Sequence, residues 1–113
     1  MIRAVTERYA EQQRLVGLAP REHVQRLAGR QRVHQAAVVG SVARGDFNVW
    51  SDVDVVVVAD ALPERVLDRT LVLMEGRPPR VEAIGFTPDE LEDARRRRNP
   101  LVVELDSIGI PVL

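Results

Sequence analysis

The sequence predicts a layered domain of the α/β (α+β) class, in which a small mixed β-sheet is flanked by helices. Two short apolar blocks carry this prediction. Residues 36–39 end abruptly at Gly40-Ser41, as a strand entering a tight turn does, and the valine run 55–58 is typical of a strand buried on both faces. Apolar residues at helical spacing precede, separate and follow these blocks. Strands that alternate with helices form layered α/β domains.

Residues 1–32 are expected to form a helical lead-in. Its first apolar face, at helical spacing, consists of Ile2, Val5, Tyr9, Leu15 and Val16. A second helix should start near Arg21, because Pro20 stands just before another apolar series with helical spacing. We therefore place the chemistry in the remaining residues.

The expected catalytic core, residues 33–113, opens with a strand that ends at the Gly40-Ser41 turn. A short helix and a loop over 46–50 lead into the second strand, which begins at Asp52. Trp50 is expected to pack this loop over the core. The alternative for Trp50 is a stacking surface for a base or a partner.

A helix and a third strand follow the valine run. Pro63 at a first helical position and Gly76 just beyond the end mark the helix. Its apolar face is expected to consist of Val66, Leu67, Leu71 and Met74. Residues 80–86 form the third expected strand.

The end of the chain is expected to be mainly helical. A capping-box start lies over 87–90, where the Thr and Glu side chains can satisfy each other's backbone donors, and this helix is expected to reach Arg98. Asn99-Pro100 interrupts the pattern, a last helix stops at Gly109, and a short extended tail covers 110–113.

Composition narrows the class of function. The chain has 113 residues, 45% apolar and 29% charged, enough for one modest core and one domain, residues 1–113. All 16 basic residues are arginines, which excludes lysine-based P-loop, Schiff-base and kinase chemistry, and the lack of cysteine excludes thiol nucleophiles and zinc-thiolate sites. A net charge of −1 argues against nucleic acid held by bulk charge. The longest apolar run is too short to span a bilayer, and we expect a cytoplasmic protein with no membrane partner.

Two carboxylates at the start of the second strand are the first chemical signal. Asp52 and Asp54 are two residues apart, so side-chain alternation along a strand sends both to the same face. Two anions on one face repel, and placing them at the mouth of a valine strand is costly unless a cation holds them together. An all-oxygen cluster suits Mg²⁺ or Mn²⁺ completed by water and substrate phosphates.

The Gly40-Ser41 turn complements this pair. Glycine allows a sharp strand-to-helix turn, and the backbone N–H groups that follow can receive a phosphate, with the Ser41 hydroxyl as a further donor. Arg44 is expected to add a bidentate phosphate contact, the alternative being a surface residue paired with Asp46. Ser51 is expected to cap the turn or to hydrogen-bond near the carboxylates.

The pattern from Gly40 to Asp54 resembles a known family. Gly-Ser, ten intervening residues and Asp-x-Asp, with Ala-Arg-Gly after the Gly-Ser and Ser before the first Asp, is similar to the nucleotidyltransferase superfamily related to DNA polymerase beta. The short chain resembles its minimal nucleotidyltransferase (MNT) members, which are often paired with HEPN partners in toxin–antitoxin modules. The resemblance extends through the third strand and the Thr-Pro-Asp-Glu-Leu-Glu stretch, roughly the last two-thirds of the chain.

The resemblance implies a third carboxylate on the next strand, and Glu82 is the matching position. It implies that Asp52, Asp54 and Glu82 bind two metal ions, with Gly40, Ser41, Arg44 and Ser51 on the nucleotide side. In such a site an acceptor hydroxyl attacks the α-phosphate in line and expels pyrophosphate, and Glu82 lies nearest the acceptor. The alternative for Glu82 is a strand-edge carboxylate paired with Arg80 or Arg77.

The implied function is transfer of a nucleoside monophosphate, AMP from ATP, to a hydroxyl on a HEPN-type toxin partner, which makes the chain an antitoxin. Two alternatives stay open: a non-catalytic module that neutralises its partner by occlusion, and a transferase acting on a small molecule. Self-association is also compatible with the sequence. Arg95–Arg98 is expected to be a solvated helix end, with a contact to a partner or to RNA as the alternative, and the isolated His23 and His34 are assigned to no metal.

Overall fold

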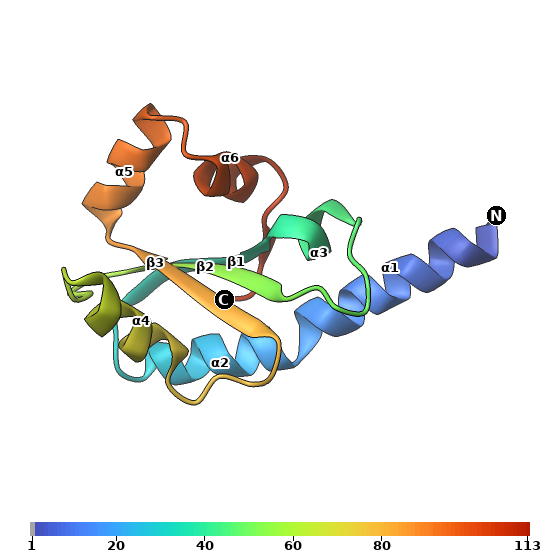
Figure 1. Ribbon diagram of the computed structural model, residues 1–113, viewed down its shortest axis with the longest axis horizontal. Helices are drawn as coiled ribbons and strands as arrows, with labels where there is room; N and C mark the ends of the chain where they lie inside the picture. The colour runs from blue at the N-terminus through green and yellow to red at the C-terminus, as the bar shows by residue number, and fades with distance from the viewer. Residues whose placement is uncertain (1) are drawn as a thin grey trace.

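The computed structural model describes residues 2–113, with side chains from Ala4 onward, and is built around a four-stranded mixed sheet of order β3-β2-β1-β4 (Figure 1). The strands are β1 (Val33–Val39), β2 (Val53–Ala59), β3 (Val81–Phe86) and β4 (Ile110–Pro111). β1 pairs antiparallel with β2 and with β4, whereas β2 and β3 run parallel. The mixed sheet of the sequence prediction is confirmed, and the expected extended tail supplies its short edge strand.

The helices cover the two faces of the sheet unequally. The helices are α1 (Ile2–Gly17), α2 (Ala19–Ala28), α3 (Gly40–Arg44), α4 (Val66–Met74), α5 (Pro88–Arg96) and α6 (Pro100–Ser107). α1, α2 and α4 pack on one face, α5 and α6 lie on the other, and α3 sits at one end of the sheet (Figure 1). None of the helices in the described chain is long and apolar enough to cross a membrane.

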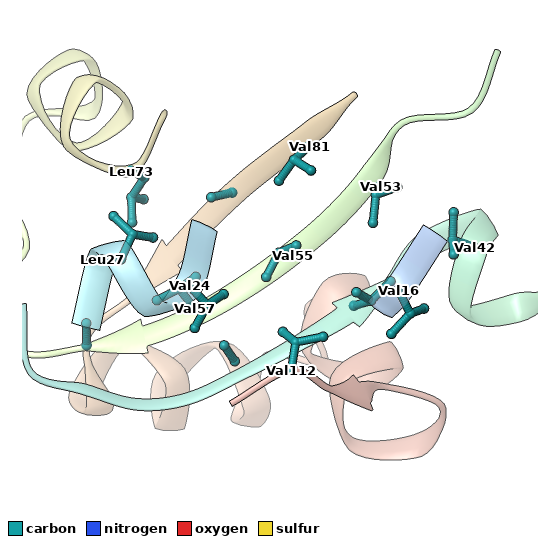
Figure 2. Close-up of a cluster of buried hydrophobic side chains, with 14 of the residues drawn as sticks. Val16, Val24, Leu27, Val42, Val53, Val55, Val57, Leu73, Val81 and Val112 are labelled. Carbon is teal, nitrogen blue, oxygen red and sulfur yellow. The ribbon is translucent and has the colours of Figure 1, made fainter. Parts of the chain in front are cut away.

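Each face of the sheet has its own apolar cluster. On the α1, α2 and α4 side, Val55 and Val57 of β2 meet Val24 and Leu27 of α2 (Figure 2). On the α5 and α6 side, alternate residues of the same strands meet the apolar residues of those two helices. The valine run of β2 is therefore buried from both sides, as its composition predicts.

The helical lead-in is confirmed, but its apolar face is only half used. Val16 is buried in the core, whereas Val5 and Tyr9 are 69% and 62% exposed. The reason is geometric, because the first half of α1 extends past the end of the sheet (Figure 1). The side chain of Ile2 lies outside the described residues.

The expected apolar face of α4 is wrong at three of its four residues, while Met74 is partly buried against the core. Val66, Leu67 and Leu71 are exposed, and Leu73, which was not on that face, is buried. The helix also begins at Val66 rather than at Pro63, whose carbonyl oxygen instead accepts a 2.7 Å bond from Arg69 Nε. Helical spacing alone does not select the buried side chain, because Leu73 packs into the space above Gly85 of β3.

The C-terminal segment follows the sequence prediction closely. The capping box over 87–90 is present, with both reciprocal hydrogen bonds. α5 ends at Arg96 rather than Arg98, because Arg98 takes a left-handed φ of +54° and the residue before Pro100 must leave the helical region. The Asn99 side chain then caps α6 by accepting a bond from the Leu101 backbone N–H.

Candidate active site

Two carboxylates face each other across β2 and β3. Asp54 and Glu82 are register partners on these parallel strands, whose backbones lie about 4.8 Å apart. Their neighbours Val53 and Val81 belong to the cluster under α1, α2 and α4, so alternation sends both carboxylates to the α5 and α6 side. The strand pairing thus brings together two acids that are 28 positions apart in the sequence.

The sequence predicts that the second strand begins at Asp52. In the structure, Asp52 lies one residue before β2, which begins at Val53. Regular pairing begins at Val53, whose backbone N–H donates to the Arg80 carbonyl oxygen at 2.6 Å. Asp52 is exposed, while Asp54 and Glu82 are half-buried. All three carboxylates are therefore accessible from solvent at one end of the sheet.

Burial raises the pKa of Asp54 above its usual range, and the negative charges of Glu82, Asp52 and Glu104 raise it further, in that order. The negative charges of these acids therefore repel one another. No three His, Cys, Asp or Glu side chains within the described residues already form a metal-binding group. The donor set nevertheless fits Mg²⁺, because it consists of carboxylate oxygens that repel one another when no cation is between them.

The turn at Gly40 is pressed against the Asp54 carboxylate. Gly40 has a φ of +72°, and a Cβ at this position would lie 2.6 Å from Asp54 Oδ2. Only glycine meets both conditions without moving the carboxylate. Ser41, next in the chain, is partly exposed, and its carbonyl oxygen accepts the Gly45 N–H that closes α3. A phosphate contact by Ser41 stays a prediction.

Arg44 is held by two carboxylates. Its Nε lies 3.3 Å from Asp46 Oδ2, and its Nη1 lies 2.8 Å from Glu104 Oε2 on α6. The pairing with Asp46 is the alternative that the sequence offered, whereas the pairing with Glu104 is new. The sequence does not predict this role for Glu104, because Glu104 lies 60 positions from Arg44. Its only local signal is its place as an acid between the apolar Val103 and Leu105.

Ser51 and Arg80 fix the backbone beside Asp52. Ser51 Oγ accepts the Asn48 backbone N–H at 2.9 Å, which is the expected turn-capping role. The Ser51 carbonyl oxygen accepts bonds from Arg80 Nε and Nη2 at 2.9 and 2.6 Å. Arg77 donates to the Val81 carbonyl oxygen instead. Within the described residues, neither arginine forms an ion pair with Glu82, so the alternative reading of Glu82 is not supported.

The expected role of Trp50 is wrong. Its side chain is 87% exposed, and Phe47, at 5%, is the residue that packs this loop over the core. The Arg8 guanidinium lies 4.7 Å from the Phe47 ring centre and donates a 2.8 Å bond to the Phe47 carbonyl oxygen.

The other charged groups lie outside this site. Arg95–Arg98 is a solvated helix end, in which Asp93 and Asp106 pair with members of the cluster. His23 is fully buried, with Nε2 2.7 Å from a backbone carbonyl oxygen of α4, and His34 pairs with an aspartate 2.8 Å away.

Comparison with known proteins identifies the family and the fold. Residues 20–108 match the model of the nucleotidyltransferase domain family. A Sulfolobus solfataricus protein described as a putative nucleotidyltransferase superposes with a TM-score of 0.66 at 22% identity, over 92% of this chain and 84% of that one. No curated protein matches the sequence. At this identity the structural likeness concerns the fold, and the family model covers most of the chain. The chain therefore belongs to the nucleotidyltransferase domain family.

Proposed function

We propose that the chain uses Mg²⁺ or Mn²⁺ to transfer a nucleoside monophosphate, AMP from ATP, to an acceptor hydroxyl. The observation that carries this proposal is the pairing of Asp54 with Glu82 on adjacent parallel strands, with Asp52 one residue before the strand of Asp54. Asp52, Asp54 and Glu82 would hold two ions, which supply neutralising charge to the substrate phosphates when bound.

The proposed reaction is a single in-line displacement at the α-phosphorus. The acceptor oxygen bonds to the α-phosphorus, the bond from phosphorus to the bridging oxygen breaks, and pyrophosphate leaves with the electron pair. Glu82 is the proposed acceptor-side group, which orients the hydroxyl, takes its proton and releases it to solvent. Asp52 and Asp54 hold the nucleotide side, and the half-exposed setting leaves room for both substrates.

The proposed nucleotide-binding side consists of Gly40, Ser41, Arg44 and Ser51. Gly40 brings the backbone close to Asp54, so the phosphates would lie beside the carboxylates. Ser41 and the neighbouring N–H groups donate to phosphate oxygens. Arg44 adds a guanidinium donor, in a sequence that has no lysine to fill this role. Ser51 acts indirectly, by holding the loop in front of Asp52.

We further propose that the acceptor lies on a HEPN-type toxin and that the chain acts as its antitoxin, as in the MNT proteins it resembles. The exposure of Asp52 supports a large acceptor, because a carboxylate open to solvent can be approached by a side chain of another protein. Within this proposal the partner supplies the rest of the pocket.

The test is transfer of label from α-phosphate-labelled ATP in the presence of Mg²⁺. The purified chain is incubated with the product of the adjacent gene, and wild type is compared with Asp52→Asn/Asp54→Asn. Label on the neighbour that the double variant loses supports transfer. Neutralisation of the neighbour without label, and unchanged in the variant, would show a binding module that acts by occlusion. Label that appears only with added small hydroxyl compounds would move the acceptor to that class.

A further inference from the structure

The Arg44 guanidinium is fixed by two carboxylates from different parts of the chain. Asp46 follows α3 directly, whereas Glu104 belongs to α6 on the α5 and α6 side of the sheet. The described contacts use Nε and Nη1, and none of those contacts uses Nη2. A side chain that is usually flexible is thus held with one donor nitrogen left over.

Glu104 is the firmer of the two supports. Its side chain is 22% exposed, against 64% for Asp46, and its distance to Arg44 is the shorter one. The helix beneath it is anchored by Val102 and Leu105, both buried in the cluster on this side of the sheet. A rigid carboxylate therefore stands beside the candidate site.

We propose that Glu104 is a positioning residue, which holds the Arg44 guanidinium in the orientation that binds the triphosphate of the nucleotide. The inference rests on the proposed function and adds to it a residue from α6. An arginine that is already ordered loses less conformational freedom when it binds, and its hydrogen bonds keep one direction. Asp46, more exposed and more distant, assists to a smaller extent.

A positioning role for Glu104 and a simple charge effect predict opposite changes in polyanion affinity when the Glu104 charge is removed. Removing a negative charge near a polyanion site strengthens polyanion binding if charge alone matters. If Glu104 orients Arg44, the same removal weakens binding. The variant Glu104→Gln keeps the size of the side chain and removes the charge. Asp106→Asn is the matched control, since Asp106 lies on the same helix and pairs with Arg95 at 2.7 Å, away from the site.

The experiment titrates inorganic tripolyphosphate with Mg²⁺ into the full chain by calorimetry. Glu104→Gln is expected to bind tripolyphosphate about tenfold more weakly than wild type, which is about the effect of losing one charge-assisted hydrogen bond. Asp106→Asn is expected to bind like wild type. In the Arg44→Ala background, Glu104→Gln should weaken binding no further, because only the effect of the removed charge is left. In the transfer assay, Glu104→Gln should raise KM for the nucleotide and leave kcat nearly unchanged.

Equal or tighter binding by Glu104→Gln would overturn the inference, as would a loss of affinity that persists in the Arg44→Ala background or a wild type that binds no tripolyphosphate. Thermal unfolding of each variant shows whether a loss comes from misfolding. The two proposals fail separately. Transfer that is insensitive to Glu104→Gln removes the positioning role and leaves the function. Absent transfer, with the binding pattern intact, removes the function and leaves the positioning role.

Discussion

The contact between Gly40 and Asp54 offers the most direct test of the site geometry. The substitution Gly40→Ala adds one methyl group, whose carbon would lie 2.6 Å from Asp54 Oδ2, at a φ of +72°. Gly45→Ala is a matched control, because Gly45 has a φ of +89° and a Cβ there meets nothing within 4 Å. Both variants carry backbone strain, and only one disturbs the carboxylate.

The expected magnitudes follow from these two facts. A left-handed alanine costs about 1 to 2 kcal/mol, which corresponds to a midpoint about 4 to 8 °C lower for a chain of this size. Gly40→Ala must in addition push the Asp54 carboxylate away by most of an ångström, an overpacking cost of about 1 to 3 kcal/mol. A displacement of that size at a reacting centre lowers transfer activity by about 100-fold.

The assay combines urea unfolding with transfer activity. Gly40→Ala should be the less stable of the two glycine variants and should lose activity, while Gly45→Ala keeps most of it. Asp54→Ala removes the obstructing oxygen, so in that background Gly40→Ala should cost no more stability than Gly45→Ala does. If the two glycine variants behave alike in both measurements, the close approach of Gly40 to Asp54 is not part of the native site.

Three further predictions concern other parts of the chain. Burial lowers the pKa of His23, so the unfolded chain takes up the proton first, and unfolding free energy should fall as pH drops below about 6.5; His23→Gln should flatten this dependence in urea titrations, and an unchanged dependence in that variant would contradict the role of His23. Mg²⁺ should raise the melting temperature of wild type, and Asp54→Asn should abolish that rise along with transfer, whereas an equal rise in both would place the ion elsewhere. Phe47→Ala should cost about 3 kcal/mol in urea unfolding and Trp50→Ala less than about 0.5 kcal/mol, and a reversed order would contradict the packing of this loop.

Much of the fold is predictable because it depends on local chemistry. The strands around Gly40 and Asp54 follow from valine density and a turn residue, and the capping box over 87–90 depends on side chains three positions apart. The α4 face was not predictable, since its three exposed apolar residues satisfy helical spacing as well as Leu73 does. Spacing defines a stripe, but only the surface beneath the helix decides which stripe is buried.

The candidate site divides in the same way. The sequence by itself determined the family pattern from Gly40 to Asp54 and the carboxylate at Glu82, because residue type and spacing record which groups a reaction needs. Only the tertiary structure decided that Glu104 meets Arg44, since that contact joins α6 to α3 across 60 positions of chain. Contacts between distant segments depend on how the sheet places its helices, and no local pattern carries that information.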